Sequence, residues 1–280
     1  MIRAGLCSVT FRPLSPEQIV DLTVGAGLPR IEWAGDVHVP PGDPGRAEEV
    51  RALTENALLD VASYGSYLRF EGEEEQVRAD GEAVLASAVA LGAPRIRVWA
   101  GSQGSADIAP EERARIAARV RAFADRAGEA GVEVGLEFHG RTLTDEIGST
   151  LALLDEVGRE NVLSYWQPHQ DMPDADALAT LRATLPHAST IHVFSWWPGS
   201  ERLPLAERGE LWEQVFGILA AEGSPRDALL EFVPGDDPEV LAREAETLRG
   251  LIAAGKRRAA SERPADPAAP PAATPEEPAR

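Results

Sequence analysis

The sequence predicts an α/β fold: a single (β/α)8 TIM barrel followed by a disordered C-terminal tail. Three observations indicate it. Short apolar runs alternate with longer amphipathic stretches up to about residue 254, which is typical of a parallel sheet with crossover helices. The 280-residue chain is 44% hydrophobic and 26% charged, an ordinary globular composition. Its length also fits one barrel, which takes about 250 residues.

The expected elements follow one another as eight strand–helix units. Glycines that can end a helix precede related strands in GLPRIEWAG and GAPRIRVWAG, a weak internal repeat. Ser15-Pro16 with Gln18, and Asp237-Pro238, are typical of helix starts. We expect strands near 2–7, 29–33, 58–63, 95–99, 132–137, 161–166, 188–194 and 227–233, and helices near 15–25, 45–56, 73–91, 110–130, 145–158, 174–185, 208–222 and 237–254.

The C-terminal segment differs in composition from the rest of the chain. GKRRAASERPADPAAPPAATPEEPAR is rich in Ala, Pro and charge and lacks aromatic residues. Such a segment buries too little apolar surface to order itself. We therefore expect a barrel over residues 1–255 and a disordered tail over residues 256–280.

Metal-ligand side chains stand at the ends of three predicted strands. Glu137 ends VEVGLEF, His192 lies in STIHVF, and Glu231 follows DALL. The carboxyl ends of barrel strands converge on one face, where the active site lies. Two carboxylates and one imidazole meeting there predict a site for one divalent metal ion. The alternative is that each is a separate polar residue satisfied by local hydrogen bonds.

A fourth ligand is expected from the strand between those of Glu137 and His192. The residue in position is Gln167, whose carbonyl oxygen binds a hard cation without adding charge. His169 or Asp171 would take its place if the following loop folded inward. The mainly oxygen set favours Mn²⁺, Mg²⁺ or Co²⁺, with Zn²⁺ possible.

Composition excludes several classes of function. The net charge of -19 disfavours binding to nucleic acid and to anionic membranes. The only lysine is Lys256, near the tail, which excludes Schiff-base chemistry. The only cysteine is Cys7, so neither an intrachain disulfide nor a multi-thiolate zinc site can form. The N-terminus lacks a secretory signal and no run spans a membrane, so we expect a cytoplasmic protein.

Aromatic and polar side chains near strand ends are candidates for contacts with a substrate. Aromatic faces suit the C–H faces of a sugar or polyol, although tryptophans at these positions also close a barrel by packing. His139 lies two residues after Glu137 and therefore on the same face of the strand. The expected substrate-binding residues are Glu32, His38, Trp99, His139, Trp166 and Trp196.

At these residues the chain resembles the xylose isomerase-like TIM barrel superfamily of sugar isomerases and epimerases. That group includes hydroxypyruvate isomerase-like, inosose dehydratase-like and ketohexose 3-epimerase-like proteins. The resemblance covers residues 1–254 and is carried by GLCSVTF, IEWAGDVH, LEFH, HVF and LLEFV. The family pattern uses Glu, Asp, His and Glu for one divalent ion. Gln167 departs from the usual Asp, which removes one negative charge and implies weaker metal binding.

The resemblance implies a metal-dependent isomerase or epimerase that acts on a small carbohydrate, polyol or keto acid. Glu137 and Glu231 would transfer protons to and from an enediolate. Two alternatives stay open: a lyase of the inosose dehydratase type, and a non-catalytic sugar-binding barrel that has lost its metal. A DNA repair endonuclease on the same barrel is disfavoured by the acidic charge and five histidines. A homo-oligomer is also compatible with the resemblance.

Overall fold

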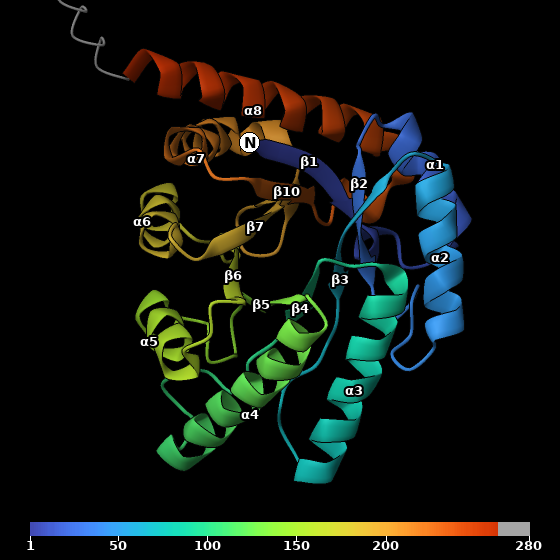
Figure 1. Ribbon diagram of the computed structural model, residues 1–280. Coiled ribbons are helices and arrows are strands. Elements are labelled where there is room, and N and C mark those ends of the chain that lie inside the picture. Colours follow the sequence, from blue (N-terminus) through green and yellow to red (C-terminus); the bar gives the residue numbers. More distant parts are fainter. Residues whose placement is uncertain (263–280) are drawn as a thin grey trace, which may run out of the picture.

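Eight parallel strands close into a barrel surrounded by helices (Figure 1). The computed structural model describes residues 1–262. The strands follow round the barrel in chain order, and β1 pairs with both β2 and β10 to close it. The predicted fold class is confirmed. The barrel strands are β1 Ile2–Cys7, β2 Arg30–Ala34, β3 Asp60–Gly65, β4 Arg95–Val98, β5 Glu133–Glu137, β6 Val162–Trp166, β7 Ala188–Val193 and β10 Arg226–Leu230.

The helices cover the outside of the barrel and bury the main apolar core between themselves and the strands. Helix α1 starts at the capping box that Ser15 and Gln18 form, as the sequence predicted. None of the helices within residues 1–262 is long and apolar enough to cross a membrane. The helices are α1 Pro16–Gly25, α2 Pro44–Asn56, α3 Glu74–Leu91, α4 Pro110–Glu129, α5 Ile147–Val157, α6 Asp174–Thr184, α7 Gly209–Glu222 and α8 Leu241–Glu262.

Helix α8 differs from its predicted bounds at both ends. Asp237 caps a 3-10 turn, and α8 begins only at Leu241. The helix then runs to Glu262, so the predicted disorder of residues 256–262 is wrong. This stretch is rich in good helix formers and packs on α7, where Gly255 lets the two helices approach closely: a Cβ there would lie 2.6 Å from the Gly217 nitrogen. The rest of the predicted tail, residues 263–280, lies outside the described residues.

Short elements beyond β7 and β10 were not predicted. The two-residue strands β8 and β9 pair as an antiparallel hairpin after β7. Strands of this length carry no detectable alternation, so the sequence gives no signal for them. The additional elements are β8 Ser195–Trp196, β9 Arg202–Leu203, η1 Ser8–Phe11, η2 Leu205–Arg208, η3 Pro234–Asp236 and η4 Pro238–Val240.

The lower part of the barrel interior holds ion pairs where branched apolar residues are more usual. The Asp227 carboxylate accepts hydrogen bonds from Arg3 and Arg30, and Arg95 lies 3.6 Å from it. Arg95 also donates to Thr190 across the barrel. These residues come from strands that are not all neighbours in the sheet. Their side chains therefore meet in the interior of the barrel. The charged layer supports the strands from below the predicted site.

We expect Asp227→Asn to lower the free energy of unfolding by about 3 kcal/mol, because it leaves buried guanidinium groups without their anion. Asp227 is buried, and its carboxylate is shared by several arginines. Asp60 also pairs with Arg30, but its side chain is 67% exposed. Asp60→Asn is therefore the matched control, with an expected loss below about 1 kcal/mol. Urea unfolding of both variants measures the difference, and equal losses would contradict the structural role of the buried layer.

Candidate active site

Three of the predicted ligands converge at the carboxyl end of the barrel. Glu137 ends β5, His192 lies near the end of β7, and Glu231 directly follows β10. One ligand atom from each lies within 4.8 Å of the others, and all three side chains are buried. Strand pairing explains the placement: His192 is in register with Leu229 on β10, two residues before Glu231. Because side chains alternate along a strand, Glu231 points to the same side as Leu229, and the side chains of His192 and Glu231 both point into the barrel.

Gln167 joins this cluster from the end of β6. Its Oε1 lies 3.0 Å from Nδ1 of His192. The same imidazole nitrogen lies 3.7 Å from Glu137 Oε1 and 3.5 Å from Glu231 Oε2. The two substitutes considered for Gln167 lie elsewhere. His169 stacks on Phe138 and contacts the Asp145 carbonyl, and Asp171 accepts a hydrogen bond from the Gly199 amide.

Arg97 is a member of the site that sequence reasoning missed. From β4 its side chain lies between β5 and β2, with Nη1 at 2.9 Å from Glu137 Oε2 and Nε at 3.8 Å from Glu32 Oε1. Gly65 on β3 leaves room for this contact, since a Cβ there would lie 3.0 Å from both Arg97 and Glu32. The available signal was the alternation in RIRV, which places both arginines on the inner face of the strand.

The two glutamates experience different electrostatic environments. Burial raises the pKa of Glu231 to about 7, against the attraction of His192 and together with repulsion from Glu137. Burial by itself would also raise the pKa of Glu137, but the Arg97 guanidinium and His192 hold it well below its ordinary value. One carboxylate is therefore kept as an anion, while the other can exchange a proton near neutral pH. Such a separation is typical of acid–base pairs in enzymes.

The donor chemistry of the cluster fits a divalent cation. The Trp99 indole donates a hydrogen bond to Oε2 of Glu137 at 2.5 Å, and the Arg97 guanidinium forms an ion pair with the same oxygen. The other oxygen of Glu137, Oε1, lies 3.7 Å from Nδ1 of His192. Together with Gln167 and Glu231, these atoms offer three oxygens and one nitrogen, a set that suits Mn²⁺, Mg²⁺ or Co²⁺.

A cavity of about 240 Å³ opens above the cluster. Glu137, Gln167 and Glu231 line its floor together with Arg97, while Arg12 and Gln170 lie among its other polar residues. The Trp99 ring stacks on His139 with their centroids 4.3 Å apart. A small ring-sized molecule with polar groups would be held between aromatic walls and the buried carboxylates. The aromatic and imidazole side chains of the lining are Tyr67, Trp99, His139, Phe194, Trp196 and Phe232.

The structure sorts the six predicted substrate-binding residues into two groups. Trp99, His139 and Trp196 line the cavity. The other three are buried and do not line this cavity. Trp166 faces the helices and donates to Thr180 on α6. His38 bonds with Ser8 and the Leu14 carbonyl, so both ring nitrogens are used within the protein. Glu32 lies in the barrel interior beside His192.

Comparison with known proteins supports these observations. A family model described as xylose isomerase-like TIM barrel matches residues 20–251. A curated 3-dehydroshikimate dehydratase from Bacillus anthracis is 34% identical over 217 residues, which cover 69% of this chain and 75% of that protein. A solved L-ribulose 3-epimerase has a TM-score of 0.67 at 20% identity, with 94% of this chain and 97% of that chain covered.

A third similar protein is a xylose isomerase-like TIM barrel protein from Mycobacterium smegmatis, solved in complex with magnesium. Its TM-score is 0.70 at 18% identity, with 90% of this chain and 97% of that chain covered. At these identities the two solved structures show a shared fold. The curated relative is similar in sequence as well, and it is named as a dehydratase.

Proposed function

The chain belongs to the xylose isomerase-like TIM barrel family, and on that premise we propose that it is a divalent-metal-dependent enzyme that transfers a proton next to a carbonyl group. The proposed substrate is a small carbohydrate, polyol or keto acid. One observation carries the proposal: Glu137, Gln167 and Glu231 surround Nδ1 of His192 at the floor of a cavity.

The proposed roles of the two glutamates follow from their contacts. Both line the cavity, but Oε2 of Glu137 already accepts a hydrogen bond from Trp99 and pairs with Arg97. Glu137 is therefore assigned to holding the cation, and Glu231 to taking a proton from the substrate carbon and returning it. A bound divalent ion would supply Lewis-acid polarisation of the substrate carbonyl. Aromatic side chains around the cavity would exclude water from the carbanion-like species.

Isomerisation, epimerisation and dehydration share this proton abstraction. If Glu231 or another acid returns the proton to carbon, the product is an isomer or epimer. If a hydroxyl on the next carbon leaves with a proton as water, a carbon–carbon double bond forms and the reaction is a dehydration. The similarity to a 3-dehydroshikimate dehydratase favours the dehydratase as a second candidate. The similarity in fold to an L-ribulose 3-epimerase supports the first candidate, an isomerase or epimerase.

The non-catalytic alternative depends on Gln167. A neutral amide at 3.0 Å from His192 Nδ1 replaces the carboxylate of the family pattern, which lowers the negative charge around a cation. A barrel of this kind would bind its ligand in the aromatic cavity without turnover.

The first experiment is to incubate the purified full-length chain with Mn²⁺, Mg²⁺ or Co²⁺ and candidate substrates in D₂O. The substrates would be a panel of ketoses and polyol ketones, with 3-dehydroshikimate as the representative hydroxy-ketone acid. NMR should detect metal-dependent deuterium incorporation next to the carbonyl, and ultraviolet absorption should detect a conjugated dehydration product. Exchange with an isomeric product supports the isomerase, and loss of water supports the dehydratase. Absence of exchange in every metal-loaded sample would favour the binding protein instead.

A further inference from the structure

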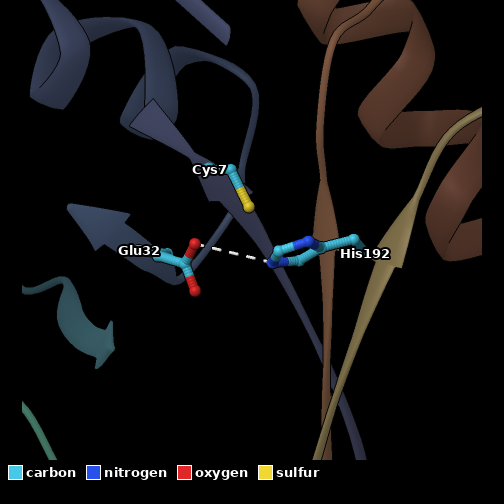
Figure 2. Close-up of side chains that lie close together, drawn as sticks. All are labelled: Cys7, Glu32 and His192. Atoms are coloured by element: carbon cyan, nitrogen blue, oxygen red, sulfur yellow. Dashed lines mark ion pairs between the residues drawn. The ribbon is translucent and has the colours of Figure 1, made fainter. Parts of the chain in front are cut away.

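His192 has a second polar side that the proposed cation site does not use. Its Nδ1 faces Glu137, Gln167 and Glu231, whereas its Nε2 points in the opposite direction. Figure 2 shows Glu32 from β2 and Cys7 from β1 grouped around that nitrogen. Nε2 is buried and has no hydrogen-bond partner at normal geometry among the described residues. Glu32 Oε1 is 3.5 Å away, at the outer limit of hydrogen-bond reach.

The Glu32 carboxylate is held in place by its own contacts. The Ser63 hydroxyl donates to Oε2 at 2.6 Å. Arg97 lies 3.8 Å from Oε1, and the absence of a side chain at Gly65 leaves room for both groups. With Oε2 occupied by Ser63, Oε1 is the oxygen that faces the imidazole. The ionised carboxylate is an acceptor only, so it favours a proton on Nε2.

We propose that Glu32 is a positioning residue that accepts the Nε2–H of His192 and thereby leaves Nδ1 as the metal-binding nitrogen. The inference rests on the proposed function, because it takes the cation to lie on the Nδ1 side. A histidine that binds a metal through one nitrogen commonly donates the other N–H to a carboxylate, which fixes the ring and makes it a better ligand. Glu32 would therefore act through His192 without touching the cation or the substrate.

Cys7 does not take this role, although Cys7, Glu32 and His192 also lie within 4.8 Å of one another. A thiol becomes a metal ligand only as a thiolate, and burial raises the pKa of the Cys7 thiol well above its ordinary value. Cys7 is therefore a small buried neighbour of the ring.

The test compares metal affinity in variants of the full-length chain. Glu32→Gln keeps the shape of the side chain and removes its charge, and Cys7→Ala alters the same cluster without touching the carboxylate. Titration calorimetry with Mn²⁺ should show that the dissociation constant rises about 10–100-fold in Glu32→Gln. It should stay unchanged in Cys7→Ala. Ser63→Ala, which removes only the hydrogen bond to Glu32, should give a smaller rise and serves if Glu32→Gln does not fold.

A spectroscopic readout separates positioning from general damage to the site. In the Co²⁺-loaded wild-type protein, NMR in water should show one strongly shifted signal from the Nε2–H of a metal-bound histidine. That proton should exchange slowly in the wild type and much faster in Glu32→Gln, because the variant lacks the charged acceptor. The signal should persist unchanged in Cys7→Ala.

The outcomes distinguish this inference from the proposed function. Equal Mn²⁺ affinity and equal proton exchange in the wild type and Glu32→Gln would overturn the role of Glu32 and leave the metal-dependent function standing. An ion bound between Cys7, Glu32 and His192 would also overturn it, since Nε2 would then be a ligand. A wild-type protein that binds neither Mn²⁺ nor Co²⁺ would overturn the inference and the proposed function together.

Discussion

Glu231→Gln is expected to lower kcat by about 10²–10⁴-fold while the barrel stays folded. Glu231 is the buried carboxylate that lines the cavity and whose pKa is raised to about 7, and its amide analogue cannot accept the substrate proton. The amide oxygen can still bind a cation. The measurements are kcat with the substrate found in the D₂O screen, metal content by elemental mass spectrometry, and thermal unfolding by circular dichroism.

The matched control for this prediction is Glu133→Gln. Glu133 lies at the opposite end of the barrel on β5, where it pairs with Arg95 and is half exposed. Its substitution should leave kcat unchanged. If Glu231→Gln retained full activity with its ion bound, Glu231 would not be the proton carrier. If the ion were lost together with activity, the experiment would assign Glu231 to metal binding alone.

Gln167→Glu should lower the dissociation constant for Mn²⁺ by at least about tenfold, because it adds a negative charge close to the other ligands. The substitution keeps the length of a side chain whose Oε1 already lies 3.0 Å from His192 Nδ1. Gln167→Asp would restore the residue type of the family pattern with a shorter reach. Calorimetry at constant pH and ionic strength measures the change.

Gln170→Glu is the control that separates a ligand from a general charge effect. Gln170 also lines the cavity, but its side chain is exposed and it has no contact with His192 among the described hydrogen bonds and ion pairs. It should change Mn²⁺ affinity much less than Gln167→Glu. An equal gain in both variants would show that Gln167 does not contact the ion. A gain in affinity accompanied by new turnover would show that the neutral amide of Gln167 prevents turnover in the wild-type protein.

The fold was predictable because it depends on local periodicity. Eight apolar runs separated by amphipathic stretches require a closed parallel sheet covered by helices, and the structure has this order. The predicted start of α8 was wrong because an Asp-Pro pair such as Asp237-Pro238 caps a 3-10 turn as readily as an α-helix. The hairpin β8–β9 was missed because two-residue strands have no periodicity.

The topology of the barrel predicts that the candidate ligands meet at one face. It does not predict which other side chains surround them. Because the carboxyl ends of parallel strands meet at one face, the sequence is enough to predict that Glu137, Gln167, His192 and Glu231 lie close together. Trp166 lies away from the cavity for a local reason: it precedes Gln167, and neighbouring residues in a strand point to opposite faces.

The sequence by itself determined the barrel, the end of the barrel that carries the site and the types of ligand available there. Only the tertiary structure placed Arg97 against Glu137 and Glu32 against His192. The first contact joins the neighbouring strands β4 and β5 and depends on their register, whereas the second joins β2 and β7, which are not neighbours, and depends on closure of the barrel. The space left by Gly65 makes room for Arg97 and Glu32. The physical reason is that a strand's alternation fixes which side chains point inward, while the partner that each one meets across the interior is set by the packing of all eight strands.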